Sequence, residues 1–107
     1  MLTGILLAAA ILTEVMATVA LKMSDGFTRL VPSSVVVVGY FTSFVLLAKL
    51  LTRDVSLGVV YAVWSAVGVA LIVMVDVIWF GERLSTVQVF GLICLIAGVC
   101  ALELGAA

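Results

Sequence analysis

The sequence has few charged residues and no histidine. Only 10% of its 107 residues are charged, whereas 66% are hydrophobic, and the mean hydropathy is +1.49. A soluble domain of this length needs a polar surface that these residues cannot form, so we expect an integral membrane protein. The net charge of −1 indicates no nucleic-acid partner. Because histidine is absent, we expect carboxyl groups to carry any proton exchange near neutral pH.

Cysteine and proline are also scarce. Cys94 and Cys100 lie six positions apart in an apolar run, on different faces of a helix. This spacing favours neither a disulfide within the helix nor a pair of metal ligands, so we interpret both as small buried hydrophobic residues. The single Pro32 stands at the beginning of another apolar run, where its missing N–H costs least.

Four apolar runs are each long enough to cross a bilayer, which takes about 20 residues. They extend over about residues 2–21, 32–51, 55–80 and 85–104, and Ser85 is a candidate N-cap of the last. Lipid offers backbone groups no partners, so such unbroken runs must be helices. We expect the first run to be retained, because no Lys or Arg precedes it as in a signal peptide. The expected fold is all-α: a single domain, residues 1–107, of four transmembrane helices.

The positive residues hardly distinguish the two sides of the membrane. Lys22, Arg29 and Arg83 fall on one side, and Lys49 and Arg53 fall on the other, with both termini. Such a small difference gives almost no bias in orientation. Two interpretations stay open: weak signals or a partner set one topology, or the chain inserts both ways round.

One carboxylate, Glu14, lies near the middle of the first apolar run. A charge at this depth costs several kcal/mol, so an intramembrane acid is a functional-site hypothesis by default. The alternative is a buried ion pair, but no Lys or Arg stands at comparable depth in any of the four runs. Since desolvation favours the neutral carboxyl, we expect Glu14 to hold a proton at rest.

Stepping by three and four positions from Glu14 identifies the residues on its helix face. They are Leu7, Ala10, Ile11, Ala17, Thr18 and Leu21. Several are small or hydroxylated, so a ligand or another helix can come close, and Thr18 can form a hydrogen bond near the acid. All of them except Leu21 are candidate substrate contacts.

One face of the third run carries two aromatic side chains, a hydroxyl and a glycine: Tyr61, Trp64, Ser65 and Gly68. Aromatic faces attract cations, and Gly68 leaves room, so this face suits an apolar organic cation. The alternative is an aromatic belt at the membrane interface, because Tyr61 lies near the end of its run. Given the unpaired carboxylate, we favour a cation pocket, with Tyr40 of the second run as a weaker member.

Gly91 and Gly98 lie seven positions apart, two turns along one stripe of the last run. Small residues in such a stripe permit close helix packing. Four short helices are too few to enclose a path for a drug-sized ligand, so we expect a dimer in which two copies of Glu14 share one chamber. Asp76, near the end of the third run, is either a second protonatable group or, as we favour, a solvated acid at a helix end.

These residues resemble, in order and spacing, the small multidrug resistance family of proton-coupled cation exporters over nearly the whole chain. The resemblance rests on Glu14, Ala17, Thr18, Leu21, Lys22, the loop 24–30, Pro32, Ser33, Tyr40, the segment 61–65, Gly68, the segment 81–84, Gly91 and Gly98. It implies an antiparallel, dual-topology dimer in a bacterial inner membrane that exchanges protons for aromatic or quaternary ammonium cations.

The resemblance also assigns roles to particular positions. It makes Glu14 the carboxylate shared by proton and substrate, and Gly91 and Gly98 the dimer contact. It makes Tyr40, Tyr61 and Trp64 the aromatic substrate contacts. Guanidinium exporters of the family usually carry tryptophan at the position of Ala17, and Tyr40 and Ser65 also match the multidrug branch.

The chain departs from the family pattern at two places. Thr3 and Gly4 stand where an aromatic residue is often found, and Asp76 stands where the residue is more often small or apolar. Three alternatives stay open: a guanidinium-type exporter, one subunit of a pair of unlike chains, and a non-transporting accessory membrane protein. We expect no enzymatic activity, no metal, and no cofactor beyond the proton as coupling ion.

Overall fold

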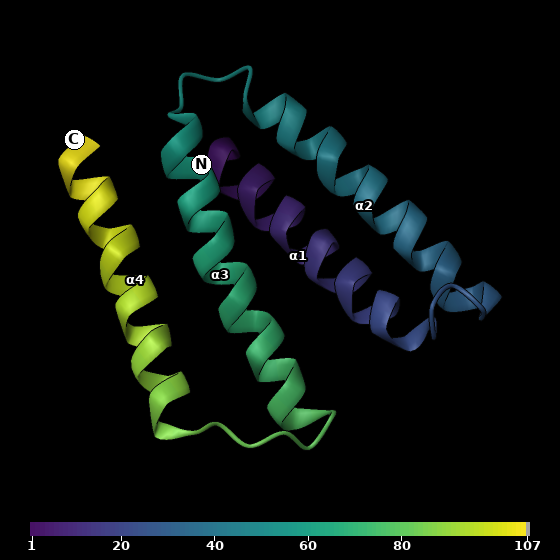
Figure 1. Cartoon of the computed structure of the whole chain (residues 1–107). Coiled ribbons are helices and arrows are strands. Elements are labelled where there is room, and N and C mark those ends of the chain that lie inside the picture. Colours follow the sequence, from purple (N-terminus) through teal and green to yellow (C-terminus); the bar gives the residue numbers. More distant parts are fainter. Residues whose placement is uncertain (107) are drawn as a thin grey trace. The chain divides into compact units, whose positions relative to one another are not determined.

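The computed structural model describes residues 1–106 and shows four α-helices joined by short loops (Figure 1). The helices are α1 (Leu2–Met23), α2 (Leu30–Leu50), α3 (Leu57–Ile78) and α4 (Thr86–Ala106). Each is long and apolar enough to cross a membrane. No strand occurs among the described residues. The all-α, multi-pass membrane fold is therefore confirmed, and each helix ends within two residues of its expected bounds.

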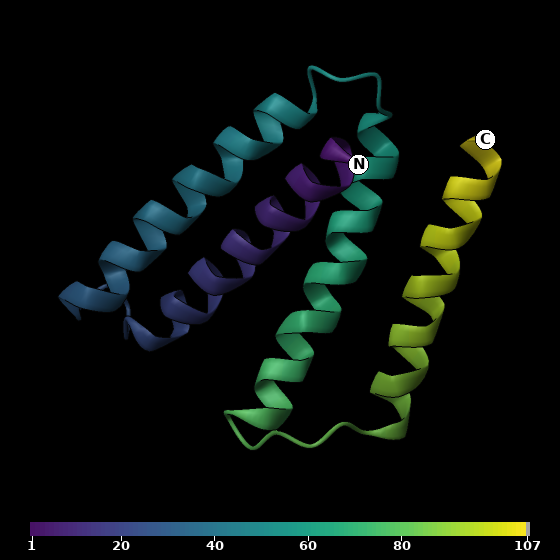
Figure 2. The ribbon, with the colours of Figure 1, turned by 180° about the vertical axis from the view of Figure 1, so that it is seen from behind.

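The chain separates into two compact units. The first unit is Met1–Val55 and contains α1 and α2, while the second unit begins at Ser56 and contains α3 and α4. Each unit is an antiparallel helical hairpin, as the two opposite views show (Figures 1 and 2). That the two units form a single four-helix domain stays a prediction.

In the first unit, α1 and α2 approach closely because small residues meet. Gly39 of α2 faces Ala17 of α1: a Cβ at Gly39 would lie 2.8 Å from the Ala17 Cβ and 3.2 Å from the Thr13 carbonyl oxygen. Only glycine fits there without moving a helix. The buried residues Val36, Ser43 and Leu50 lie seven apart along α2, which places them on one face.

The loop between α1 and α2 turns tightly around a fully buried serine. The Ser24 hydroxyl donates to the Leu21 carbonyl oxygen at 2.7 Å and accepts from the Phe27 N–H at 3.1 Å. Asp25, Gly26 and Phe27 follow with φ of 50°, 70° and 68°. Three successive left-handed residues reverse the chain within a few residues, so α2 returns along α1.

In the second unit, serine side chains cap the start of both helices. Ser56 accepts from the Val59 N–H at 3.4 Å at the beginning of α3. Before α4, the Ser85 hydroxyl accepts from the Gln88 N–H at 3.1 Å and the Ser85 N–H donates to the Gln88 side chain at 2.9 Å. This reciprocal pair is a capping box, so the predicted N-cap at Ser85 is confirmed.

Helix α4 contacts α3 within its unit, but none of its side chains described over residues 86–105 is buried. Cys94 and Cys100 are exposed free thiols, so the expectation that they are buried is wrong for the single chain. The physical reason is that α4 has one helical neighbour in its unit, and one neighbour covers only a narrow stripe of a helix.

Candidate functional site

Glu14 lies in the membrane-spanning part of α1 and is half-buried. The Thr18 hydroxyl, one turn further along α1, donates to the Glu14 carbonyl oxygen at 3.0 Å and reaches the carboxyl oxygen Oε1 at 3.5 Å. Both acceptors belong to Glu14. The predicted hydrogen bond of Thr18 near the acid is therefore present.

Thr18 also joins the two helices of the first unit. Its Oγ1 lies 2.6 Å from the hydroxyl oxygen Oη of Tyr40 on α2, which is hydrogen-bonding distance. The structure thus brings together three of the predicted site residues, Glu14, Thr18 and Tyr40, in one line of hydroxyl and carboxyl groups.

The sequence analysis did not identify Ser43, which contacts the helical turn of α1 that ends at Glu14. Ser43 is fully buried, and its hydroxyl donates to the Ala10 carbonyl oxygen at 2.9 Å. In an α-helix the carbonyl of residue 10 pairs with the N–H of residue 14, so Ser43 anchors the turn that carries Glu14. The available signal was its position three residues after Tyr40, on the same face of α2.

The other α1 candidates lie around this turn. Ala10, Ile11 and Ala17 are buried, with Ala17 against Gly39 of α2, while Leu7 is half-buried. Their predicted contact with a substrate stays a prediction. What the structure adds is that Ala17 lies at the closest recorded approach to Gly39, so its small size also serves helix packing.

The aromatic candidates of α3 belong to the second unit. Tyr61 is 69% exposed, and Trp64 and Ser65 are half-buried. Gly68 is buried, and a Cβ there would lie 3.9 Å from the Cδ1 atom of Trp64, an ordinary van der Waals contact. Their joining Glu14 in one pocket stays a prediction.

Asp76 is half-buried in the last turn of α3. Its carbonyl oxygen accepts from the Glu82 N–H at 2.9 Å, so the loop after α3 folds back to this level. Gly81, with φ of 69°, allows that turn. This position next to the loop agrees with an acid at a helix end. Within residues 1–106, no group of three His, Cys, Asp or Glu side chains gathers as metal ligands.

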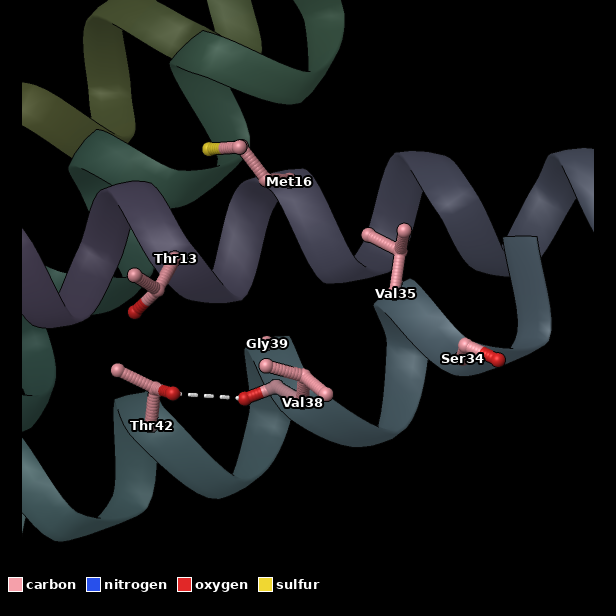
Figure 3. A pocket seen from close by; sticks show the side chains of 7 residues that line it. All are labelled: Thr13, Met16, Ser34, Val35, Val38, Gly39 and Thr42. Atoms are coloured by element: carbon pink, nitrogen blue, oxygen red, sulfur yellow. Dashed lines mark hydrogen bonds between the residues drawn. The ribbon is translucent and has the colours of Figure 1, made fainter. Parts of the chain in front are cut away.

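A groove of about 370 Å³ runs between α1 and α2 (Figure 3). It is lined by Thr13, Met16, Ser34, Val35, Val38, Gly39 and Thr42. Its three hydroxyl groups donate to carbonyl oxygens of their own helices, as Thr42 does to Val38 at 2.8 Å. The groove therefore presents an apolar wall, and neither Glu14 nor Tyr40 lines it. A cation would find no counter-charge there.

Comparison with known proteins identifies the family. A family model described as Small Multidrug Resistance protein matches residues 2–96. Multidrug resistance protein mmr of Mycolicibacterium paratuberculosis is 46% identical over 103 residues, covering 96% of each chain. Multidrug resistance protein EbrA of Bacillus licheniformis is 41% identical over 94% of each chain. Quaternary ammonium compound-resistance protein QacF of Klebsiella aerogenes is 43% identical over 94% of this chain and 90% of its own length.

The match covers α1, α2 and α3 and the first half of α4. The relatives from Mycolicibacterium paratuberculosis and Bacillus licheniformis are aligned over at least 94% of their own length, so the similarity is not limited to a shared fragment. The resemblance found in the sequence is confirmed, and the chain belongs to the small multidrug resistance family.

Proposed function

We propose that this protein exports lipophilic organic cations, including quaternary ammonium compounds, across a bacterial cell membrane in exchange for protons. Relatives that share over 40% of its residues are named for resistance to multiple drugs or to quaternary ammonium compounds. The observation that carries the proposal is Glu14: a carboxyl in a membrane-spanning helix, hydrogen-bonded by Thr18, with no basic residue at its depth.

Competition at Glu14 supplies the coupling. A protonated carboxyl has no charge to offer a cation, and a carboxylate paired with a cation holds no proton. A cation that enters from the cytoplasmic side therefore displaces the proton. After the protein opens to the other side and the cation leaves, Glu14 takes up a proton again. Export and proton entry are then linked because one group serves both ligands.

Aromatic side chains provide the walls of the site. Tyr40 is tied to Thr18 at 2.6 Å, which holds its ring beside the Glu14 turn. Tyr61, Trp64 and Ser65 offer two aromatic faces and a hydroxyl from α3. We propose that they complete the pocket with Leu7, Ala10, Ile11, Ala17 and Thr18 of α1. Aromatic faces attract cations while the apolar surface holds their hydrocarbon groups.

The proposed working form is an antiparallel dimer. Gly91 and Gly98 of α4 are exposed, and a Cβ at either would meet no described atom within 4 Å, so packing within the described part of the second unit does not require glycine there. A second α4 packed on that stripe would require it. The near balance of positive residues on the two sides supports insertion in both orientations.

Binding of tetraphenylphosphonium to the purified protein, titrated across neutral pH, tests the proposal. We expect tight binding that weakens on acidification, because protons compete for Glu14. Glu14→Gln removes the counter-charge and should lower the affinity by roughly 2–5 kcal/mol, the usual effect of removing one partner of a desolvated charge pair. The remaining binding should not depend on pH.

Glu103→Gln, which removes an exposed carboxyl near the end of α4, is the matched control and should leave the titration unchanged. Unchanged affinity and pH dependence in Glu14→Gln would refute the proposed role of Glu14. If the wild type ignored tetraphenylphosphonium and bound small guanidinyl compounds instead, the guanidinium-type alternative would replace this proposal.

A further inference from the structure

The hydroxyl groups of Thr18 and Tyr40 can each donate only one hydrogen bond. A threonine hydroxyl has one proton to donate, and the same holds for a tyrosine hydroxyl. Thr18 Oγ1 has three oxygen neighbours: Glu14 carbonyl O at 3.0 Å, Glu14 Oε1 at 3.5 Å and Tyr40 Oη at 2.6 Å. When Thr18 donates to either oxygen of Glu14, the proton between Thr18 and Tyr40 must therefore come from Tyr40.

The charge of Glu14 decides which hydroxyl donates in the hydrogen bond between Thr18 and Tyr40. An ionised carboxylate only accepts, and a hydrogen bond to it is roughly twice as strong as one between neutral groups. Thr18 then donates to Glu14, and Tyr40 donates to Thr18. A protonated Glu14 carboxyl carries its own O–H and can donate to Thr18 Oγ1, which lets Thr18 donate to Tyr40. Each hydroxyl keeps its own proton and only rotates, so no bond breaks except the O–H of Glu14 itself.

We infer that Thr18 makes the donor state of the Tyr40 hydroxyl follow the charge of Glu14, so that the aromatic wall on α2 responds to the acid on α1. With Glu14 charged, the Tyr40 hydroxyl donates its proton in the hydrogen bond to Thr18. The lone pairs of the Tyr40 oxygen then point away from Thr18, and they suit a cation. With Glu14 neutral, the Tyr40 proton turns outward and presents a positive end. The inference rests on the proposed function, since it takes Glu14 as the group that gains and loses the proton.

Few other charged side chains of the first unit could change the hydrogen bond between Thr18 and Tyr40. Besides Glu14, the charged side chains of α1 and α2 are Lys22 and Lys49, each in the last turn of its helix. Tyr40 is the titratable side chain that α2 brings to the Thr18 hydroxyl. Thr18 touches both helices through one oxygen atom, so it is a positioning residue that couples the two groups.

Nuclear magnetic resonance of the full-length protein in lipid bilayers tests the inference without any transport measurement. Carbon-13 labels at the glutamate carboxyl and at the tyrosine ring carbon that bears the hydroxyl report each group, and Glu14→Gln and Tyr40→Phe identify the two signals. We expect the Tyr40 signal to change with pH at the same midpoint as the Glu14 signal. In Glu14→Gln the Tyr40 signal should stay constant.

Two variants of Thr18 separate coupling from a merely structural role. Thr18→Val keeps the shape and removes the hydroxyl, so Glu14 should still titrate while the Tyr40 signal no longer follows it. Thr18→Ser keeps a hydroxyl and should restore the response. If Thr18→Val fails to assemble, the wild type still decides, because a constant Tyr40 signal while Glu14 titrates overturns the inference.

The outcomes also separate this inference from the proposed function. A Tyr40 signal that still follows Glu14 in Thr18→Val overturns the role of Thr18 and leaves the shared carboxylate intact. A Glu14 carboxyl that keeps one protonation state between the pH that supports cation binding and the pH that abolishes it refutes the proposed function, and the inference with it.

Discussion

The two units of this protein are built from helices of similar length and apolarity but hold together differently. In the first unit, α1 and α2 are joined by the Ser43–Ala10 hydrogen bond, the Thr18–Tyr40 contact and the Gly39–Ala17 approach. In the second unit, no side-chain hydrogen bond joins α3 to α4 within residues 1–106. None of the side chains described in α4 is buried.

The two units therefore differ in where their polar contacts lie and in how much helix surface they leave exposed. A carboxyl in a bilayer needs a polar partner in a fixed place, because lipid offers none. In the first unit Thr18 of α1 is that partner, and Tyr40 of α2 contacts Thr18 in turn. The exposed face of α4 carries Gly91 and Gly98, which no contact among the described residues of the second unit requires to be glycine. The recorded polar contacts of Glu14 therefore lie within the first unit, whereas the side chains described in α4 of the second unit are not buried.

The largest effect is expected where the first unit packs most closely. Gly39→Ala places a methyl group 2.8 Å from the Ala17 Cβ and should destabilise the α1–α2 hairpin by about 1–3 kcal/mol through overpacking. Unfolding in mixed lipid and detergent micelles measures this change. Gly4→Ala on α1, where a Cβ meets nothing within 4 Å, is the control and should show no loss. Equal stability of the two variants would contradict the close approach.

The corresponding change in the second unit should act on association instead. Gly98→Leu fills the stripe on α4 and should weaken dimerisation roughly tenfold, about 1.4 kcal/mol, without unfolding the monomer. Dimer dissociation can be followed by energy transfer between labelled chains diluted in lipid. Ala97→Leu, one position away from the stripe, should leave association nearly unchanged. A similar loss in both variants would place the contact elsewhere on α4.

Ser43→Ala removes one of the two side-chain hydrogen bonds that are recorded between α1 and α2, and it keeps the shape of the site. The Ala10 carbonyl retains its helical partner, so the cost should be about 0.6 kcal/mol, the average for an interhelical hydrogen bond in a membrane. Ser65→Ala on α3 serves as a comparison for stability. If Ser43→Ala left stability unchanged, the bond to Ala10 would contribute nothing to the hairpin.

The smallest effect is expected at Asp76, in the last turn of α3. A negative charge there opposes the helix dipole, so Asp76→Asn should stabilise α3 by about 0.3 kcal/mol. Its cation binding should keep the wild-type dependence on pH, measured with the same tetraphenylphosphonium titration. A shifted pH dependence would make Asp76 a second acid in the transport cycle and would change the comparison, since both units would then carry a working carboxyl.

Much of the fold followed from the sequence because it depends on short-range properties. Runs of apolar residues must become helices in lipid, and the polar segments between them set the helix ends to within two residues. Capping at Ser85 was also readable, because its partner Gln88 lies only three residues away. The burial of Cys94 and Cys100 could not be read in this way, because burial depends on which helix lies alongside.

The same distinction between short-range properties and tertiary contacts applies to the site. The sequence by itself determined that Glu14 is an intramembrane acid and that Thr18 lies one turn away, since both facts depend on position within one helix. Only the tertiary structure decided that Ser43 anchors the Glu14 turn and that Tyr40 meets Thr18 at 2.6 Å. The reason is that the register between α1 and α2 depends on how closely the helices approach, and Gly39 against Ala17 permits that approach.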